Sequence, residues 1–255
     1  MNNIKTTILF LALMSIGACK REPVVVQEAN TSIIGYEKKN SSIRIDVLDN
    51  SQFICFTPEN CTLDYVVNTP PQKEDSTIMF CMAASFTGQR METFEYSNIC
   101  GTYFADSKVW NKDIQPTINI DASFAYWNDS SYFSIGKDVA LLESAIKNNG
   151  VFFMQKHVLC DGERGQMNLT KSTIYRVLAK YNDDLCVIQN TQPMEYMPFV
   201  QGLENLGIKD AIYLDMGGWR YSWYRDEEGK VIELFPVTKD TKYQTNWIIF
   251  RTKKK

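Results

Sequence analysis

The chain is poor in histidine: His157 is the only one among 255 residues. Zinc sites are built mainly from histidine and closely spaced cysteine, and the sequence also lacks a CxxC pair. A serine hydrolase is disfavoured, because no GxSxG motif occurs and one histidine leaves little choice of base. P-loop and dinucleotide-binding motifs are missing too. We therefore expect no metal and no cofactor.

The sequence also has no excess of positively charged residues. The formal net charge is −3 and the isoelectric point is 5.4. No basic stripe with interleaved aromatic residues occurs, so we expect no nucleic-acid partner. Beyond the N-terminal segment, no apolar run reaches the length of a membrane-spanning helix.

The N-terminal segment predicts export. Thr6 to Ile16 is mostly apolar but too short to span a membrane comfortably, and it ends in Gly17-Ala18-Cys19. This ending resembles a bacterial lipobox, in which Cys19 is lipidated and becomes the mature N-terminus. The alternative is an ordinary secretory signal with a chance cysteine. A lipobox predicts a lipid-anchored protein of the bacterial cell envelope, on the periplasmic or outer-membrane side. The expected parts are a signal peptide (1–18), a flexible tether (19–32) and one domain (33–255).

Six further cysteines allow disulfides in an exported chain. Cys55 and Cys61 are close in sequence and form the most plausible short loop. Cys81 and Cys186, in contrast, lie inside apolar runs where cysteine often serves as a small hydrophobic residue.

Short apolar segments with strand-like patterns predominate. Ser42 to Leu48 alternates like a half-buried strand. Ser76 to Phe86 is nearly all apolar, which is typical of a central strand buried on both faces. Aromatic alternations between Ile99 and Gly136 predict antiparallel hairpins. Val151 to Leu159 is predicted to be one strand that pairs with the chain after the Asp161-Gly162 turn.

Two helices are predicted, over Lys137–Asn149 and Pro193–Leu206, from apolar residues at helical spacing. The second lies between strands predicted at 185–189 and 211–214. Such a β-α-β unit is right-handed in nearly all proteins and makes its two strands parallel. The predicted fold class is α+β: a mixed β-sheet core with a few packing helices and one right-handed β-α-β unit near the C-terminus.

Asp215 directly follows the short apolar run Ala211 to Leu214. Ligand sites in α/β proteins often lie at the carboxyl ends of parallel strands. Gly217 and Gly218 then allow the backbone to turn sharply. The alternative is that Asp215 caps a turn and the aromatic residues after it belong to the core.

Four segments carry a family resemblance: Ala83-Ala84-Ser85-Phe86, Gln155 to Gly162, the Arg176 to Ile188 hairpin, and Leu206 to Gly218. In this order they resemble motifs of the phosphodiester glycosidase family, in a divergent bacterial lipoprotein branch. The last segment is the most specific, and the resemblance covers roughly residues 76 to 251.

The resemblance implies an enzyme that hydrolyses a sugar-1-phosphodiester or a related glycosidic linkage. Asp215 would be the catalytic carboxylate, which stabilises an oxocarbenium-like state or activates water. Arg176 would bind phosphate oxygens in a bidentate fork, and the Gly217 and Gly218 N–H groups would form an anion-binding nest. Further expected substrate-binding residues are Trp219, Arg220, Ser85, Gln155 and His157. For His157 a proton-carrying role and a structural role are both open.

The chain also departs from the family pattern. Ala83 replaces an asparagine, Met216 a glycine and Trp219 a serine. These departures favour an alternative, a catalytically degenerate lipoprotein that binds a glycan or glycosyl phosphate. In that case Trp219, Tyr221, Trp223 and Tyr224 would line the crevice, because aromatic faces suit sugar rings. Either way, the expected partners are a carbohydrate or glycosyl-phosphate ligand and a membrane reached through the N-terminal lipid.

Overall fold

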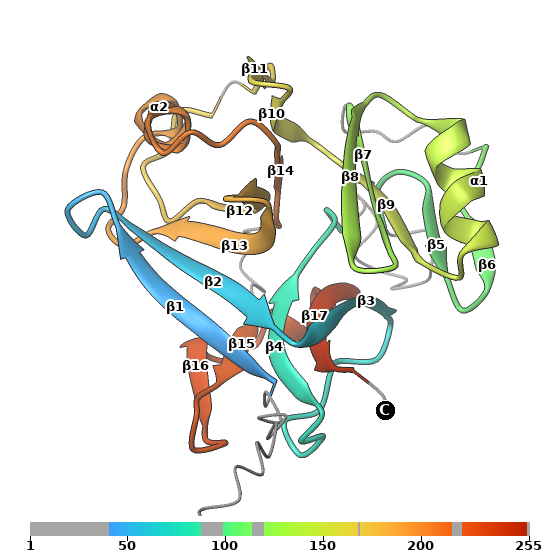
Figure 1. The fold of residues 1–255 in the computed structure, drawn as a ribbon, viewed down its shortest axis with the longest axis horizontal. Coiled ribbons are helices and arrows are strands. Elements are labelled where there is room, and N and C mark those ends of the chain that lie inside the picture. Colours follow the sequence, from blue (N-terminus) through green and yellow to red (C-terminus); the bar gives the residue numbers. More distant parts are fainter. Residues whose placement is uncertain (1–40, 88–98, 114–119, 168, 216–220, 254–255) are drawn as a thin grey trace, which may run out of the picture. The chain divides into compact units, whose positions relative to one another are not determined.

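The computed structural model describes residues 41–87, 99–113, 120–167, 169–215 and 221–253. Within them strands predominate, and the helices are α1 (Val139–Lys147), α2 (Tyr196–Asn205) and the short 3-10 helix η2 (Thr241–Tyr243) (Figure 1). The fold is α+β, as the sequence predicts. None of the helices described is long and apolar enough to cross a membrane. The predicted signal peptide and tether lie outside the described residues.

The first sheet has seven strands, and every neighbouring pair in it is antiparallel. Its order is β1 (Ser42–Leu48), β2 (Phe53–Glu59), β13 (Asp184–Asn190), β12 (Arg176–Tyr181), β14 (Ala211–Tyr213), β10 (His157–Cys160) and β11 (Glu163–Arg164).

The predicted β-α-β unit consists of β13, α2 and β14. Both strands run antiparallel to β12, so they are parallel to each other. They are not neighbours, because β12 lies between them. The handedness of the unit stays a prediction.

The other two sheets have five strands each and are also antiparallel. The second has the order β16 (Val231–Phe235), β15 (Ser222–Arg225), β4 (Ile78–Ala83), β17 (Asn246–Thr252) and β3 (Cys61–Val67). The third has the order β6 (Lys108–Trp110), β5 (Tyr103–Ala105), β9 (Val151–Gln155), β7 (Ala122–Trp127) and β8 (Ser130–Ile135).

Asparagine and aspartate make the tight turns of the hairpins. Asn128 and Asp129 join β7 to β8 with φ angles of 49° and 60°. Asn182 and Asp183 join β12 to β13 with φ angles of 50° and 67°. Two consecutive residues with positive φ match the right-handed twist of a hairpin, and these side chains tolerate that conformation best after glycine. The local sequence therefore fixes where these strands reverse.

The predicted strand from Val151 to Leu159 is divided in two. It breaks at Lys156, and β9 and β10 belong to different sheets. Side chains bind the backbone at this break: Lys156 N donates to Gln155 Oε1 at 2.9 Å and His157 N donates to Asp121 Oδ1 at 3.0 Å. Such local side-chain bonds compete with strand pairing. The predicted pairing across Asp161-Gly162 is present between β10 and β11.

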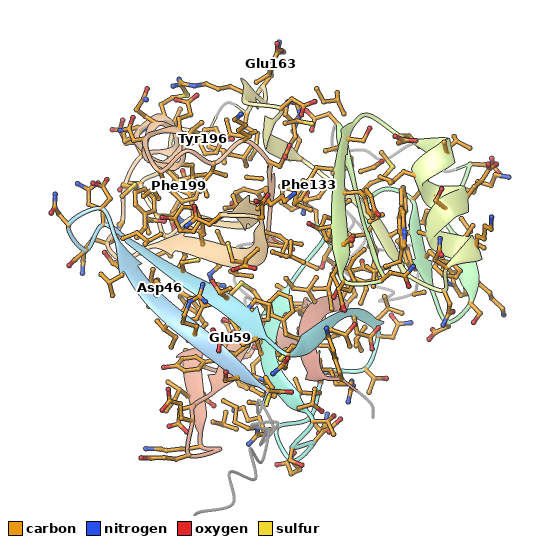
Figure 2. The ribbon with its side chains drawn as sticks, in the orientation of Figure 1. Asp46, Glu59, Phe133, Glu163, Tyr196 and Phe199 are labelled. Atoms are coloured by element: carbon orange, nitrogen blue, oxygen red, sulfur yellow. The ribbon has the colours of Figure 1, made fainter. Side chains whose placement is uncertain are left out.

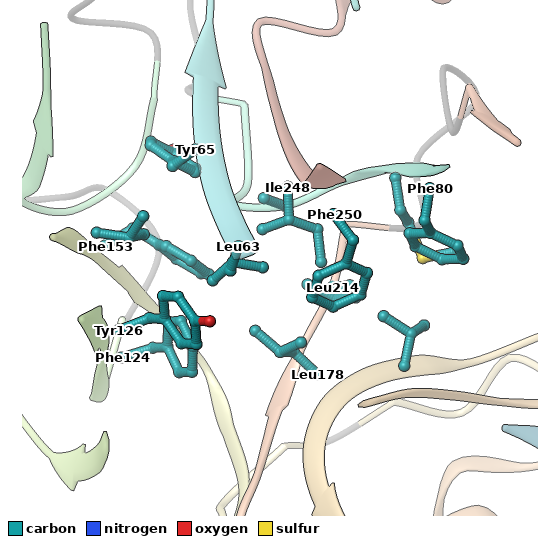
Figure 3. Close-up of a cluster of buried hydrophobic side chains, with 14 of the residues drawn as sticks. Leu63, Tyr65, Phe80, Phe124, Tyr126, Phe153, Leu178, Leu214, Ile248 and Phe250 are labelled. Atoms are coloured by element: carbon teal, nitrogen blue, oxygen red, sulfur yellow. The ribbon is translucent and has the colours of Figure 1, made fainter. Parts of the chain in front are cut away.

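Side chains from all three sheets form one core (Figure 3). Tyr65 of the second sheet stacks on Phe153 of the third, with ring centroids 4.9 Å apart. Strand β4 is buried at every position and lies in the middle of its sheet, which confirms the predicted central strand. The members labelled in the figure are Leu63, Tyr65, Phe80, Phe124, Tyr126, Phe153, Leu178, Leu214, Ile248 and Phe250.

Helix α2 covers the opposite face of the first sheet. Its Tyr196 and Phe199 (Figure 2) are buried against Phe53, Tyr175 and neighbouring residues. This packing fixes the connection from β13 to β14, and hence the position of Asp215 at the end of β14.

All six cysteines in the described part of the chain are free and buried. The short disulfide between Cys55 and Cys61 is therefore absent. Cys61 Sγ lies 3.3 Å from Glu59 O, whereas Cys55 Sγ lies 3.5 Å from Thr57 Oγ1 and faces Cys186. The two thiols belong to strands of different sheets, β2 and β3, although they are close in sequence.

Candidate functional site

The three sheets are linked where the chain leaves β4. The carbonyl oxygen of Ala84 accepts the backbone N–H of Asp215 at 2.9 Å and the Nε2–H of Gln155 at 3.1 Å. Ala84 follows β4 of the second sheet, Gln155 ends β9 of the third, and Asp215 comes after β14 of the first. We call residues 84–87 the junction segment. One carbonyl thus connects the carboxyl ends of strands from all three sheets.

Ser85 and Gln155, two expected substrate-binding residues, are brought together here and are buried. Ser85 N donates to Asn246 Oδ1 at 2.7 Å, and Ser85 Oγ donates to Met154 O at 3.3 Å. Tyr65 OH in turn donates to Ser85 Oγ at 3.3 Å. These bonds hold the junction segment in place, while a contact of either residue with substrate stays a prediction.

Asp215 lies beside the same segment and is 6% exposed. Its Oδ2 accepts the Thr87 N–H at 3.4 Å, a long bond. Burial and the nearby Asp215 charge raise the pKa of Cys100 to about 11, and they also raise the pKa of Tyr213. The carboxylate thus has a defined position among the junction segment, Cys100 and Tyr213.

Arg176, the other predicted catalytic residue, begins β12, the neighbour of β14. Leu214 N donates to Arg176 O at 3.0 Å, so the backbone of Arg176 lies beside Leu214, the residue that precedes Asp215. Its guanidinium is fully buried, with Cζ 3.8 Å from the centroid of the Phe235 ring and Nε donating to Gln189 Oε1 at 2.9 Å.

The described contacts place the side chains of Arg176 and Asp215 on different faces of the first sheet. Arg176 is paired with Leu214, and opposed residues of antiparallel strands share a face. Asp215 instead approaches Thr87, next to Phe86, whose ring packs 5.5 Å from Tyr213 on the other face. Both side chains have further partners besides these. Their meeting in one cleft stays a prediction.

The sequence did not single out Asp121 and Lys156, which surround His157. Asp121 Oδ2 lies 2.8 Å from Lys156 Nζ, and Asp121 Oδ1 lies 3.3 Å from His157 Nδ1. Burial opposes ionisation of Asp121, but the bonds from His157 and Lys156 outweigh it and lower the pKa of this carboxyl. The one signal in the sequence was the Lys156-His157 pair, which interrupts an otherwise apolar run.

The remaining predicted residues Gly217, Gly218, Trp219 and Arg220 lie outside the described residues. Of the aromatic residues expected to line a crevice, Trp223 is fully buried beside Cys81 and Trp247. Tyr224 packs on Phe56 with ring centroids 5.7 Å apart. Trp223 therefore belongs to the core and offers no sugar-binding face, whereas Tyr224 is partly buried against the core.

Of the surface pockets, three that are lined by described residues have volumes of about 500, 210 and 290 Å³, and Asp215, Arg176 and His157 do not line these three. In the part of the chain that the structure describes, no three His, Cys, Asp or Glu side chains gather as metal ligands would.

No protein-family model matches the chain, and no curated protein matches it by sequence. Among solved structures, it resembles the catalytic domain of zebrafish N-acetylglucosamine-1-phosphodiester alpha-N-acetylglucosaminidase, auto-inhibited by pro-peptide. The TM-score is 0.53 at 10% identity, over 84% of this chain and 83% of that one. A hypothetical protein from Synechocystis matches with a TM-score of 0.43 at 10% identity, over 82% of this chain and 61% of that one. The first likeness shows a distant structural relationship in the fold.

Proposed function

We propose that this protein is a glycosidase-type hydrolase that cleaves a sugar-1-phosphodiester or a related glycosidic linkage. The observation that carries the proposal is the placement of Asp215. It is a nearly buried carboxylate at the carboxyl end of β14, on a fold that resembles a phosphodiester glycosidase catalytic domain. A carboxylate beside the anomeric carbon stabilises the positive charge of an oxocarbenium-like transition state.

Replacement of Asp215 by asparagine tests the proposal. The substrates are methyl phosphodiesters of N-acetylglucosamine-1-phosphate and of other sugar-1-phosphates, and the readout is release of methyl phosphate. We expect Asp215→Asn to lower kcat by about 10²-fold or more, because the charged group is lost while the shape is kept. Asp183→Asn is the matched control, since Asp183 is a 97% exposed turn residue. Full activity of Asp215→Asn, or no turnover of any such diester by the wild type, would refute the proposal.

A second candidate is a lipoprotein that binds a glycan or glycosyl phosphate without cleaving it. Ala83 favours it, because this residue replaces the family asparagine and is fully buried opposite Trp247. Calorimetry with the same diesters separates the two candidates: saturable binding by a wild type that releases no methyl phosphate supports the second.

We also propose that the protein is anchored to the bacterial cell envelope through lipid on Cys19. The support is the Gly17-Ala18-Cys19 ending of the N-terminal apolar segment. Metabolic labelling with an alkynyl fatty acid should mark the wild type and leave Cys19→Ser unlabelled. Equal labelling of the two would contradict the anchor.

A further inference from the structure

Three consecutive polar residues are buried at the start of β17. Gln244, Thr245 and Asn246 follow the short helix η2, and β17 begins at Asn246. Their exposed fractions are only 5%, 3% and 1%. Burial of an amide or a hydroxyl costs free energy unless the group finds hydrogen-bond partners. We call these three residues the polar strip, and their partners lie on the two chain segments that flank Asp215.

The side-chain amide of Asn246 pairs with both backbone groups of Ser85. Its Oδ1 accepts the Ser85 N–H at 2.7 Å, and its Nδ2 donates to Ser85 O at 3.1 Å. The regular pairing of β17 with β4 ends one residue away, at Trp247 and Ala83. The Asn246 side chain therefore continues this pairing beyond the end of β4 and fixes the backbone of the junction segment.

Thr245 contacts the other end of the junction segment. Its Oγ1 lies 3.5 Å from Thr87 Oγ1 and accepts Asn246 Nδ2 at 3.4 Å. Both contacts are long, so each is weak. Thr87 N donates to Asp215 Oδ2, and Ala84 O accepts the Asp215 N–H at 2.9 Å. Asp215 therefore binds the junction segment at both of its ends, and the polar strip holds that segment in place.

Gln244 holds the chain where it returns after Asp215. Tyr221 comes six residues after Asp215 and directly precedes β15. Gln244 Oε1 accepts the Tyr221 N–H at 2.9 Å, and its Nε2 lies 3.5 Å from Tyr221 O. The polar strip thus fixes two backbone segments at once, the one that Asp215 binds and the one that follows it in the sequence.

We propose that the polar strip positions Asp215, with Asn246 as its main positioning residue. Asn246 acts through Ser85 and the junction segment, and this role rests on the proposed function only for the reaction that Asp215 carries out. A reacting group has to be held within about 0.5 Å of its productive position, and a shift of about 1 Å can lower the rate by about 10²-fold. Loss of the Asn246 amide frees the Ser85 backbone, so Asp215 loses its fixed support.

Backbone hydrogen exchange, followed by NMR, tests the positioning without any substrate. The reporters are the N–H groups of Asp215 and Cys100, which bind carbonyl oxygens of the junction segment at 2.9 and 2.8 Å. Asn246 hydrogen-bonds to neither of these N–H groups. If the polar strip holds the segment, both N–H groups should exchange faster in Asn246→Ala, by about tenfold or more.

Asn190→Ala is the matched control for the loss of a buried amide. Asn190 is fully buried, and its amide binds the backbone of residues 173, 175 and 192 rather than the junction segment. This variant should leave the Asp215 exchange rate unchanged. Thr245→Val is a milder change, because it removes one hydroxyl and keeps the shape of the side chain. It should speed Asp215 exchange by about threefold, and it tests the strip even where Asn246→Ala does not fold.

Kinetics with a diester that the wild type hydrolyses gives the second readout. Referred to the folded fraction, kcat of Asn246→Ala should fall by about 10²-fold, while KM changes by less than about threefold. The reason is that Asn246 holds the reacting group and does not bind the substrate. Wild-type Asp215 exchange in Asn246→Ala, equally fast exchange in Asn190→Ala, or a wild-type kcat in Asn246→Ala would overturn the inference.

These outcomes are separate from those of the proposed function. Faster Asp215 exchange in Asn246→Ala, with a wild type that hydrolyses no diester, would leave the positioning role standing and remove the hydrolase. Turnover by the wild type together with unchanged Asp215 exchange in Asn246→Ala would do the reverse.

Discussion

At the scale of residues, burial of the thiols determines how slowly they react. An exposed ion pair determines how stability depends on pH. The six described cysteines are at most 8% exposed, and burial raises the pKa of Cys61 and Cys100 to about 11. The reactive form of cysteine is the thiolate, which is scarce at pH 8 for such a group.

Thiol titration tests this description. In the folded Cys19→Ser protein at pH 8, Ellman's reagent should react slowly with the six described thiols, because all of them are buried. In guanidinium chloride all six should react at once. Rapid reaction of any of the six in the folded state, or fewer than six thiols after unfolding without reductant, would contradict the structure.

Asp75 is predicted to give a pH-dependent contribution to stability. Its Oδ1 accepts the Thr77 hydroxyl at 2.6 Å and its Oδ2 accepts Arg251 Nη1 at 2.7 Å, which together lower its pKa to about 2. A depressed pKa stabilises the folded state above the ordinary value of 3.8, and this stabilisation is lost as pH falls towards 2.

At pH 7 the variant Asp75→Asn should therefore have a free energy of unfolding about 0.5 kcal/mol lower than that of the wild type. The loss is small because the Asp75 side chain is 37% exposed. The difference from wild type should shrink between pH 4 and pH 2. Glu227→Gln, on an exposed turn, should match the wild type at every pH. If the free energy of unfolding of Asp75→Asn stayed below that of the wild type by the same amount from pH 7 to pH 2, the Asp75 charge would not be the cause. Urea unfolding at each pH provides the measurement.

At the scale of elements, one glycine sets how closely α2 approaches the first sheet. A Cβ at Gly202 would lie 2.3 Å from Phe53 Cζ, and Phe53 is fully buried. Alanine normally stabilises a helix relative to glycine, by about 1 kcal/mol. At this position the clash should outweigh that gain.

We expect Gly202→Ala to lower the free energy of unfolding by about 1–3 kcal/mol, the usual cost of overpacking. Gln201→Ala, one residue earlier on the exposed side, controls for the general effect of alanine. Because α2 leads into β14, near-ultraviolet circular dichroism should also change. A more stable Gly202→Ala protein would show that α2 packs less closely than described.

At the scale of the whole molecule, local signals predicted the elements and distant contacts decided their arrangement. Asn128-Asp129 and Asn182-Asp183 fixed two hairpins, and the apolar run around Phe80 marked the central strand. The break at Lys156 could not be predicted, because Asp121, some 35 residues earlier in the chain, binds the backbone there.

The candidate site was likewise predictable where its residues follow local patterns and unpredictable where distant strands position them. The position of Asp215 after a buried strand follows from the pattern Ala211 to Leu214, and the structure places Ser85 and Gln155 beside it. The direction of the Arg176 side chain depends on strand register, and register is set by pairings between distant strands. The Asp121 to His157 contact joins two sheets, and its one local trace is the Lys156-His157 pair within an otherwise apolar run.

The central claim is that the chain breaks the bond between the anomeric carbon and the phosphate oxygen of a sugar-1-phosphodiester. Hydrolysis of the N-acetylglucosamine-1-phosphate methyl diester in ¹⁸O-labelled water, followed by ³¹P NMR of the methyl phosphate, tests it most directly. A glycosidase adds the oxygen of water to the sugar, so the methyl phosphate should carry no ¹⁸O. Methyl phosphate that contains ¹⁸O would mean attack at phosphorus, and the protein would then not be a glycosidase.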